Sequence, residues 1–516
     1  MNQPRDQMAG YHDDLILLSD RGDLMEPIVE FFLDPDGPAK RDGLNLSPPK
    51  SLCINLRDVA VDPNGVSCLG SVLGTEEARR NFVAAKIATT RERVGRLAAL
   101  PTQHALLLLR ECMGQELRHL LRTVRFTDIS DLLNDMDKTL YDAIDFLRHA
   151  PVVAEGTPDP DKARRESIIS LPLRLAGFGI LSHAETALVA AQASDFASRR
   201  TLAAHHIPLA YTREELAAIM RQKGCPDADN PYLNTMEEDM PEAVDEAAPV
   251  PDSQHALTHQ LMEKKYKLLL QSLPPDEQLS LVDNGSKIGT AWLRAMPSAN
   301  WRHLTNSQTR AAMSQRLLVP RGNGGANCPH CAEHNSVLHF DHCQGIGRQG
   351  AVNRRHNYLR DRLMLLLKKA GHHVSKEPPI LPNHIQRADL RVSAAAGAPG
   401  NNDDVLVDVT VKAPQAHNTV AARAAALAAF DGDNLRTGVW KQLAAAIRVG
   451  VHLKNQHYHA LNVQVVPLVI SSGGTLDVDF DNFLKTYVPV ARMRADFVMD
   501  VSVALVRFRA WMYATG

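Results

Sequence analysis

Two aspartates in the last quarter of the chain have the spacing that a metal-dependent phosphodiesterase needs. Asp389 follows Arg387 and Ala388, and Asp408 lies 19 residues later in the apolar segment Val405–Lys412. Turn-forming residues between them predict a hairpin that places the two carboxylates side by side. Two carboxylates and a main-chain carbonyl leave room on Mg²⁺ for water and a phosphate oxygen. The pair therefore predicts a magnesium site, although ordinary edge or turn acids would show the same spacing.

Lysine and glutamate side chains near this pair could complete the site. Because side chains alternate along a strand, Lys412 points to the same side as Asp408. A lysine there could orient the attacking water or neutralise charge on the phosphate. Glu377, at the end of the preceding predicted strand, could add a third carboxylate.

A basic helix is predicted just before these carboxylates. Residues 344–376 hold eight Lys or Arg side chains against one acid, Asp361, and residues 351–370 have the spacing of an amphipathic helix. Binding to the DNA backbone requires such a positive patch beside the metal. A merely solvated helix face would have the same composition. The side chains that we expect to hold DNA phosphates are Arg355, His356, Arg360 and Arg362.

A cysteine cluster precedes the basic helix. Its pattern is Cys-x2-Cys-x7-His-x3-Cys, which supplies the two close ligand pairs of a tetrahedral zinc site in a chain with only seven cysteines. Such a closed site would hold a small fold together rather than perform chemistry. Neighbouring histidines are alternative ligands, and three adjacent free cysteines are the alternative interpretation. The expected ligands are Cys328, Cys331, His339 and Cys343.

The segments around these motifs predict an α+β multidomain chain. Strands and turns are expected first, then amphipathic helices, and finally strands that alternate with helices. Residues 225–252 hold nine acids, five prolines and no Lys or Arg, as in a solvated linker. The expected units are a strand-rich start 1–75, helices 76–222, an acidic linker 223–253, helices 254–326, a zinc knuckle 327–345 and an α/β domain 346–516.

The overall composition sets limits on partners and location. The chain has 516 residues, and its 57 basic and 59 acidic side chains give a net charge of −2. A nucleic-acid partner is therefore indicated only by local patches. The few cysteines indicate a reducing compartment rather than a disulfide scaffold. No signal peptide or transmembrane segment is expected, because the apolar runs are far shorter than a span.

A second acidic motif lies near the start of the chain. Tyr11-His12-Asp13-Asp14 precedes the apolar run 15–18. An aspartate pair in a tight turn between strands is a magnesium-binding arrangement of polymerases. Two acids before an apolar strand also form simple turns, so the motif alone does not decide between these interpretations.

Taken together and in order, these motifs resemble the C-terminal portion of non-LTR retrotransposon polyproteins that carry a restriction-like endonuclease. Tyr11-His12-Asp13-Asp14 resembles the Tyr-x-Asp-Asp box of reverse transcriptases. The resemblance covers nearly the whole chain. The other segments on which the resemblance rests are residues 43–51, 66–70, 171–180 and 292–297, the zinc array, Arg355-His356-Asn357 and the pair Asp389 and Asp408.

The resemblance implies a fold and an activity for each part of the chain. It implies a partial reverse transcriptase palm and helical thumb, followed by a PD-(D/E)XK-type nuclease fold at residues 350–475. It also implies nicking of target DNA, which primes reverse transcription of the element's RNA. A nuclear location after synthesis in the cytoplasm would follow from the chromosomal substrate.

Two departures from the family pattern change these expectations. The chain begins just before the Tyr-x-Asp-Asp box, so the palm motif with the other catalytic aspartate is missing, and we expect no reverse transcriptase activity from Asp13 and Asp14. In the nuclease part, the family pattern has a lysine two residues after the second aspartate, whereas Lys412 lies four residues after Asp408. Lys441 or Lys454, on the following predicted helix, could therefore supply the lysine instead.

The resulting hypothesis is a truncated retrotransposon protein with a Mg²⁺- or Mn²⁺-dependent DNA endonuclease, in which the zinc knuckle fixes the basic helix against DNA. The alternative is a catalytically dead, degenerate remnant that still binds nucleic acid. Salt-dependent binding without cleavage would favour that remnant. A cellular nuclease unrelated to transposition is a third interpretation.

Overall fold

The structure of the chain is a computed structural model. Several predicted features lie outside the residues that it describes: the zinc ligands Cys328, Cys331, His339 and Cys343, together with Asp13 and the acidic segment 225–252. The described residues are 7–11, 14–18, 65–68, 70–149, 159, 161–204, 254–298, 300–319, 349–380, 387–393, 404–432 and 434–514.

Two short hairpins precede the helices. β1 (Gln7–Tyr11) and β2 (Asp14–Leu18) pair antiparallel, so Asp14 is the first strand residue after the turn. β3 (Val66–Cys68) and β4 (Ser71–Leu73) form the second hairpin. Tyr11 and Asp14 pair with one another, and His12 and Asp13 between them lie outside the described residues.

Helices form the middle of the chain. They are α4 (Glu76–Arg96), α5 (Thr102–Glu111), α6 (Leu120–Thr123), α7 (Phe126–Arg148), α8 (Lys162–Ser170), α9 (His183–Ala204), α12 (Gln254–Ser272), α13 (Pro275–Asn284), α14 (Lys287–Ala291) and α15 (Asn306–Arg316). All of them except α14 contribute to one hydrophobic core. α12 packs on α9, so the helical regions before and after the acidic segment lie together. A short 3-10 turn around Gly114 lies between α5 and α6. None of the described helices is long and apolar enough to cross a membrane.

A four-stranded mixed sheet forms the C-terminal part. Its strands lie in sequence order; β5, β6 and β7 are antiparallel, and β8 runs parallel to β7. The predicted mixture of strands and helices in this part is thus confirmed. The strands are β5 (His373–Lys376), β6 (Leu390–Ser393), β7 (Val405–Lys412) and β8 (Val465–Ser471). The helices of this part are α17 (Gln349–Lys369), α18 (Val420–Ala428), α19 (Leu435–His459), α20 (Val478–Tyr487) and α21 (Ala491–Ala514).

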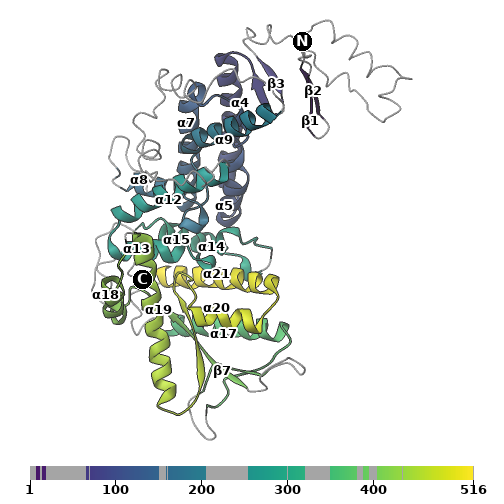
Figure 1. Cartoon of the computed structure of the whole chain (residues 1–516). Helices are drawn as coiled ribbons and strands as arrows, with labels where there is room; N and C mark the ends of the chain where they lie inside the picture. Colours follow the sequence, from purple (N-terminus) through teal and green to yellow (C-terminus); the bar gives the residue numbers. More distant parts are fainter. Residues whose placement is uncertain are drawn as a thin grey trace.

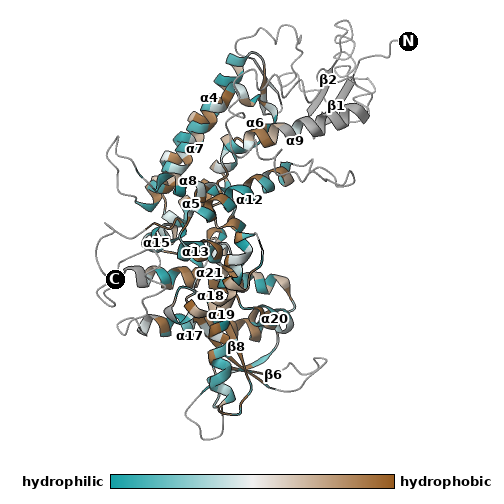
Figure 2. Cartoon of the chain, turned by 60° about the vertical axis from the view of Figure 1, so that its left-hand side comes forward, coloured by the Kyte–Doolittle hydropathy of each residue, from teal (hydrophilic) through white to brown (hydrophobic). Residues whose placement is uncertain are grey.

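The two faces of the sheet are covered by different helices (Figure 1). Val407 and Val409 of β7 are buried in a cluster with side chains of α17, α20 and α21. Because side chains alternate along a strand, Asp408 points to the opposite face, where α19 packs. Figure 2 shows that the strands are coloured mostly as hydrophobic, as expected for a sheet covered on both faces. Asp408 is therefore a charged residue in an apolar layer.

The helical part and the sheet are joined by buried polar contacts. Asp283 of α13 accepts hydrogen bonds from the Ser471 hydroxyl at 2.5 Å and the Gly473 N–H at 2.9 Å, just after β8. It also accepts from the N–H and the hydroxyl of Thr475 at 3.2 and 2.7 Å. α21 lies between α14, α15 and the sheet (Figure 1). These contacts make the sheet and the helices one packed body in the described residues.

Candidate active site

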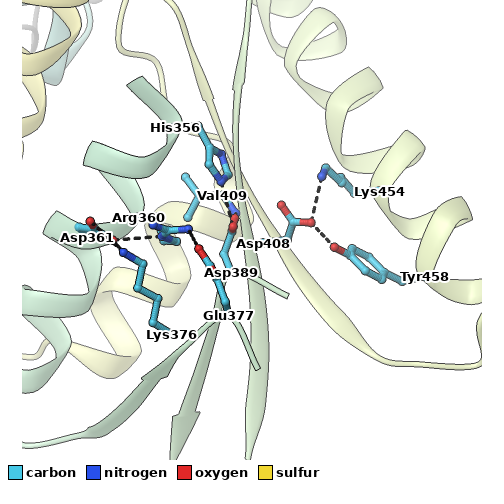
Figure 3. A network of polar contacts seen from close by, with 10 residues as sticks. All are labelled: His356, Arg360, Asp361, Lys376, Glu377, Asp389, Asp408, Val409, Lys454 and Tyr458. Atoms are coloured by element: carbon cyan, nitrogen blue, oxygen red, sulfur yellow. Dashed lines mark hydrogen bonds and ion pairs between the residues drawn. The ribbon is translucent and has the colours of Figure 1, made fainter. Parts of the chain in front are cut away.

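The two predicted aspartates meet where β6 and β7 separate (Figure 3). β6 pairs with β7 only from Leu390 opposite Val407, so the rest of β7 extends past the start of β6. Asp389 lies immediately before β6, and its N–H donates to the Val407 carbonyl at 3.1 Å. Asp408 follows Val407 on the neighbouring strand. The predicted juxtaposition of Asp389 and Asp408 is thus what the structure shows.

Asp389 is held from both sides. Its Oδ2 accepts a hydrogen bond from the Val409 N–H at 2.7 Å, so the carboxylate replaces β6 at the open edge of β7. Its Oδ1 lies 2.9 Å from Nε2 of His356, which projects from α17. Burial raises the pKa of Asp389, but the hydrogen bond and charge of His356, with the Val409 N–H, outweigh it and hold this pKa below its usual range. Asp389 is therefore an anion in a fixed orientation.

Asp408 has the opposite electrostatic character. Burial and the charge of Asp389 raise the pKa of Asp408 above its ordinary value, although Lys454 and Tyr458 act to lower it. The Lys454 ammonium lies 2.9 Å from Oδ2, and the Tyr458 hydroxyl donates to the same oxygen. Both side chains come from α19 (Figure 3). The buried Asp408 and the partly buried Asp389 repel one another, and a divalent cation would relieve this repulsion.

The lysine beside the aspartates is Lys454, the alternative that the sequence left open. The Lys412 ammonium instead lies 2.9 Å from the Asn418 side chain. Four residues of strand separate Lys412 from Asp408, which is roughly 13 Å along the backbone. The expectation that Lys412 assists at the carboxylates is therefore corrected in favour of Lys454.

Glu377 does not join the carboxylate pair through its side chain. Its Oε1 lies 2.5 Å from Nη1 of Arg360, while its backbone N–H donates to the Asp389 carbonyl at 2.9 Å. Glu377 has a φ of 50°, a left-handed conformation that turns the chain at the end of β5. The prediction of a third carboxylate ligand is thus not met; Glu377 positions the Asp389 backbone.

Most of the side chains of the basic helix that were expected to bind phosphates contact other parts of the protein. Arg355 and Arg360 are only 1% and 4% exposed, and Arg360 also contacts Asp361. Arg362 stacks on the Trp301 ring, with its Cζ 5.3 Å from the centroid. Of the four expected phosphate contacts on α17, His356 therefore points to Asp389, two arginines are buried, and Arg362 is partly covered. This corrects the expectation that Arg355 and Arg360 hold DNA phosphates.

The donor atoms at the site fit a hard divalent cation. Because the N–H and C=O of a strand residue point to the same edge, the Val409 carbonyl faces the edge that Asp389 occupies. In the described ranges, no three Asp, Glu, His or Cys side chains converge closely enough to hold a metal alone. Mg²⁺ commonly binds through one or two carboxylates and completes its shell with water and phosphate oxygens. Asp389, Asp408 and the Val409 carbonyl match that requirement.

Tyr458 is a site residue that the sequence analysis missed. It lies four residues after Lys454 on α19, so both side chains project from the same helix face. Burial and the charge of Asp408 raise the pKa of Tyr458, which keeps its hydroxyl protonated as a donor. Extending the helical spacing from the candidate Lys454 by one turn would have found it.

Comparison with known proteins does not assign a function to the candidate site, which therefore rests on its geometry. No family model matches the chain, and no curated protein matches it.

Proposed function

We propose that the chain is a metal-dependent DNA endonuclease in which Asp389 and Asp408 bind Mg²⁺ or Mn²⁺. The observation that carries the proposal is the pair formed by the buried Asp408 on β7 and the partly buried Asp389 just before β6, with the Lys454 ammonium 2.9 Å from Asp408. Opposite pKa shifts in two neighbouring carboxyl groups are typical of functional sites. The α/β layer around the pair supports the nuclease fold that the sequence resemblance implies.

Each side chain has a separate part in this proposal. A bound dication would supply Lewis-acid stabilisation of the phosphate and a more acidic water. Asp389 and Asp408 hold it, while His356 and Tyr458 fix the orientation of the two carboxylates. Lys454 provides a positive charge next to Asp408, where it stabilises negative charge that develops on the phosphate or the water.

The biological setting of this proposal comes from the retrotransposon resemblance. The substrate would be target DNA, the associated nucleic acid the element's RNA, and the location the nucleus. The zinc knuckle at Cys328, Cys331, His339 and Cys343 would stabilise the segment that leads into α17. Asp13 and Asp14 would belong to an inactive reverse transcriptase remnant.

A nicking assay on supercoiled plasmid tests the proposal. The full chain with Mg²⁺ should convert supercoiled to open-circular DNA, and Asp408→Asn should reduce the rate at least about a hundredfold. Asp404→Asn is the matched control, because Asp404 lies on the same hairpin but pairs with Ser393 at 2.5 Å, away from the site. Equal nicking by the chain and by Asp408→Asn would reject the proposed site.

The degenerate remnant is the second candidate, and one observation favours it. The predicted phosphate-binding arginines Arg355 and Arg360 are buried, which leaves α17 with fewer free cations for DNA. That candidate predicts salt-dependent binding of DNA or RNA with no nicking in Mg²⁺ or Mn²⁺.

A further inference from the structure

A cationic cavity lies in the helical part, on elements that the endonuclease proposal does not use. It has a volume of about 550 Å³ and lies between α5, the loop before α9 and the 3-10 helix η7 (Trp292–Arg294). Three arginines line it, Arg110, Arg118 and Arg294, against one acid, Glu111. These elements belong to different segments of the sequence, so the charge concentration arises only in the folded chain.

Arg110 forms the fixed base of the cavity. It is 4% exposed, and its guanidinium donates to the carbonyls of Phe178 and Leu293, each at 2.5 Å. Its Nη2 lies 3.3 Å from the Glu111 carboxylate. Burial lowers the pKa of Arg110 to about 10; Glu111 opposes this shift, whereas the charge of Arg294 adds to it. A buried cation therefore faces a second cation across the cavity.

Arg118 and Arg294 are the two arginines of the cavity that solvent can reach. Both are exposed, and in the described part of the chain neither guanidinium has a hydrogen bond or an ion pair. Most other arginines of the helical part are paired, for example Arg79 with Asp128 at 2.6 Å. The charge of Glu111 acts on both Arg110 and Arg118, but one carboxylate beside three guanidiniums leaves an excess of positive charge in the cavity. A phosphate would neutralise that excess through charge-assisted hydrogen bonds.

We propose that this cavity binds a phosphate of a single-stranded nucleic acid, with Arg118 and Arg294 as the contacting side chains and Arg110 as the fixed charge behind them. The volume is within the range of small-ligand sites and is sufficient for one nucleotide. A base can enter it only when it is not held in a base pair, so the cavity favours a single strand over a duplex. Apolar side chains, among them Leu181 and Met296, line the cavity and can contact a base or sugar. The proposal is independent of nuclease activity.

Binding of a fluorescein-labelled 12-nucleotide RNA, followed by anisotropy in EDTA, tests this proposal without cleavage. Arg118→Ala and Arg294→Ala should each weaken binding by about tenfold. Each should also reduce the slope of log K against log salt by about 0.7, the value for one phosphate contact on a single strand. Arg96→Ala is the matched control, because it removes an exposed arginine of α4 whose Nη2 pairs with Glu92 at 2.5 Å.

Three results would overturn the proposal. The first is that Arg118→Ala combined with Arg294→Ala weakens binding no more than Arg96→Ala does. The second is equal sensitivity of a 12-base-pair duplex to these substitutions. The third is AMP binding as tightly as the strand, which would assign the cavity to free nucleotides. Thermal unfolding monitors folding, which should be unchanged because neither arginine makes a hydrogen bond or ion pair within the described ranges.

Discussion

Replacement of Lys454 by methionine should change metal binding and DNA nicking in opposite directions. Methionine keeps the apolar stem and the approximate length of lysine but removes the ammonium 2.9 Å from Asp408. A cation held by Asp408 would lie within a few ångströms of that ammonium, so the two positive charges repel. Removing the lysine therefore favours Mg²⁺ binding, while it takes away the charge that we assign to phosphodiester hydrolysis.

The size of both effects follows from the exposure of the lysine. Two unit charges about 4 Å apart interact by about 1 kcal/mol in bulk water and by about 4 kcal/mol at an effective dielectric constant of about 20. The Lys454 side chain is 34% exposed, so solvent screening places the interaction near the lower value. We expect Mg²⁺ affinity to rise about five- to tenfold. Nicking should slow by about 10²–10³-fold, as when another fixed electrostatic group is removed.

Calorimetric Mg²⁺ titration and plasmid nicking measure the two effects on one preparation. Lys412→Met is the control, because it removes a lysine of the same sheet that contacts Asn418 and should leave both quantities within twofold. Weaker Mg²⁺ binding and slower nicking together in Lys454→Met would show that Lys454 only holds Asp408 in place, and our reasoning about its charge would be refuted.

Three further predictions concern pH, the junction of the two parts and zinc. The hydrogen bond to Asp389 raises the pKa of His356, so its stabilisation is complete below the ordinary value of 6.5 and is lost as pH rises through the raised pKa. The melting-temperature difference between the chain and His356→Gln should therefore shrink from about pH 6 to pH 9; a constant difference would contradict this. Asp283→Ala removes the acceptor of the Gly473 N–H and of the Ser471 and Thr475 hydroxyls, whereas the Thr475 N–H keeps the Ser471 hydroxyl oxygen at 2.6 Å, and should cost about 3 kcal/mol in urea unfolding; a loss below about 0.5 kcal/mol would be inconsistent with the buried network. Cys328→Ser with Cys331→Ser should abolish zinc measured by mass spectrometry, and retained zinc would exclude the predicted ligands.

The sequence predicted the strands of the site better than the orientation of the helix beside them. Asp389 and Asp408 come together because a hairpin register follows from chain order and alternation, both of which are local. The basic composition of α17 did not indicate which of its arginines are exposed to solvent. Arg355 lies four residues before Leu359 and eight before Leu363, on the same helical stripe as these core residues. That spacing could have predicted its burial.

Contacts between segments that are far apart in the sequence could not be predicted from local sequence patterns. The choice of Lys454 over Lys412 depends on how α19 crosses the sheet, which residue spacing within one strand cannot determine. The cavity at Arg118 and Arg294 joins residues that are far apart in sequence. Arg294 lies in the segment 292–297, but nothing in that segment indicates that Arg118 would lie beside it. Such charge clusters become visible only after the helices pack.

Electron paramagnetic resonance of Mn²⁺ binding tests most directly whether the two aspartates form a metal site. We predict Mn²⁺ binding by the full chain that is lost in Asp389→Asn and in Asp408→Asn and kept in Asp404→Asn. Unchanged binding in the Asp389 and Asp408 variants, or no binding by the unaltered chain, would contradict the proposed active site.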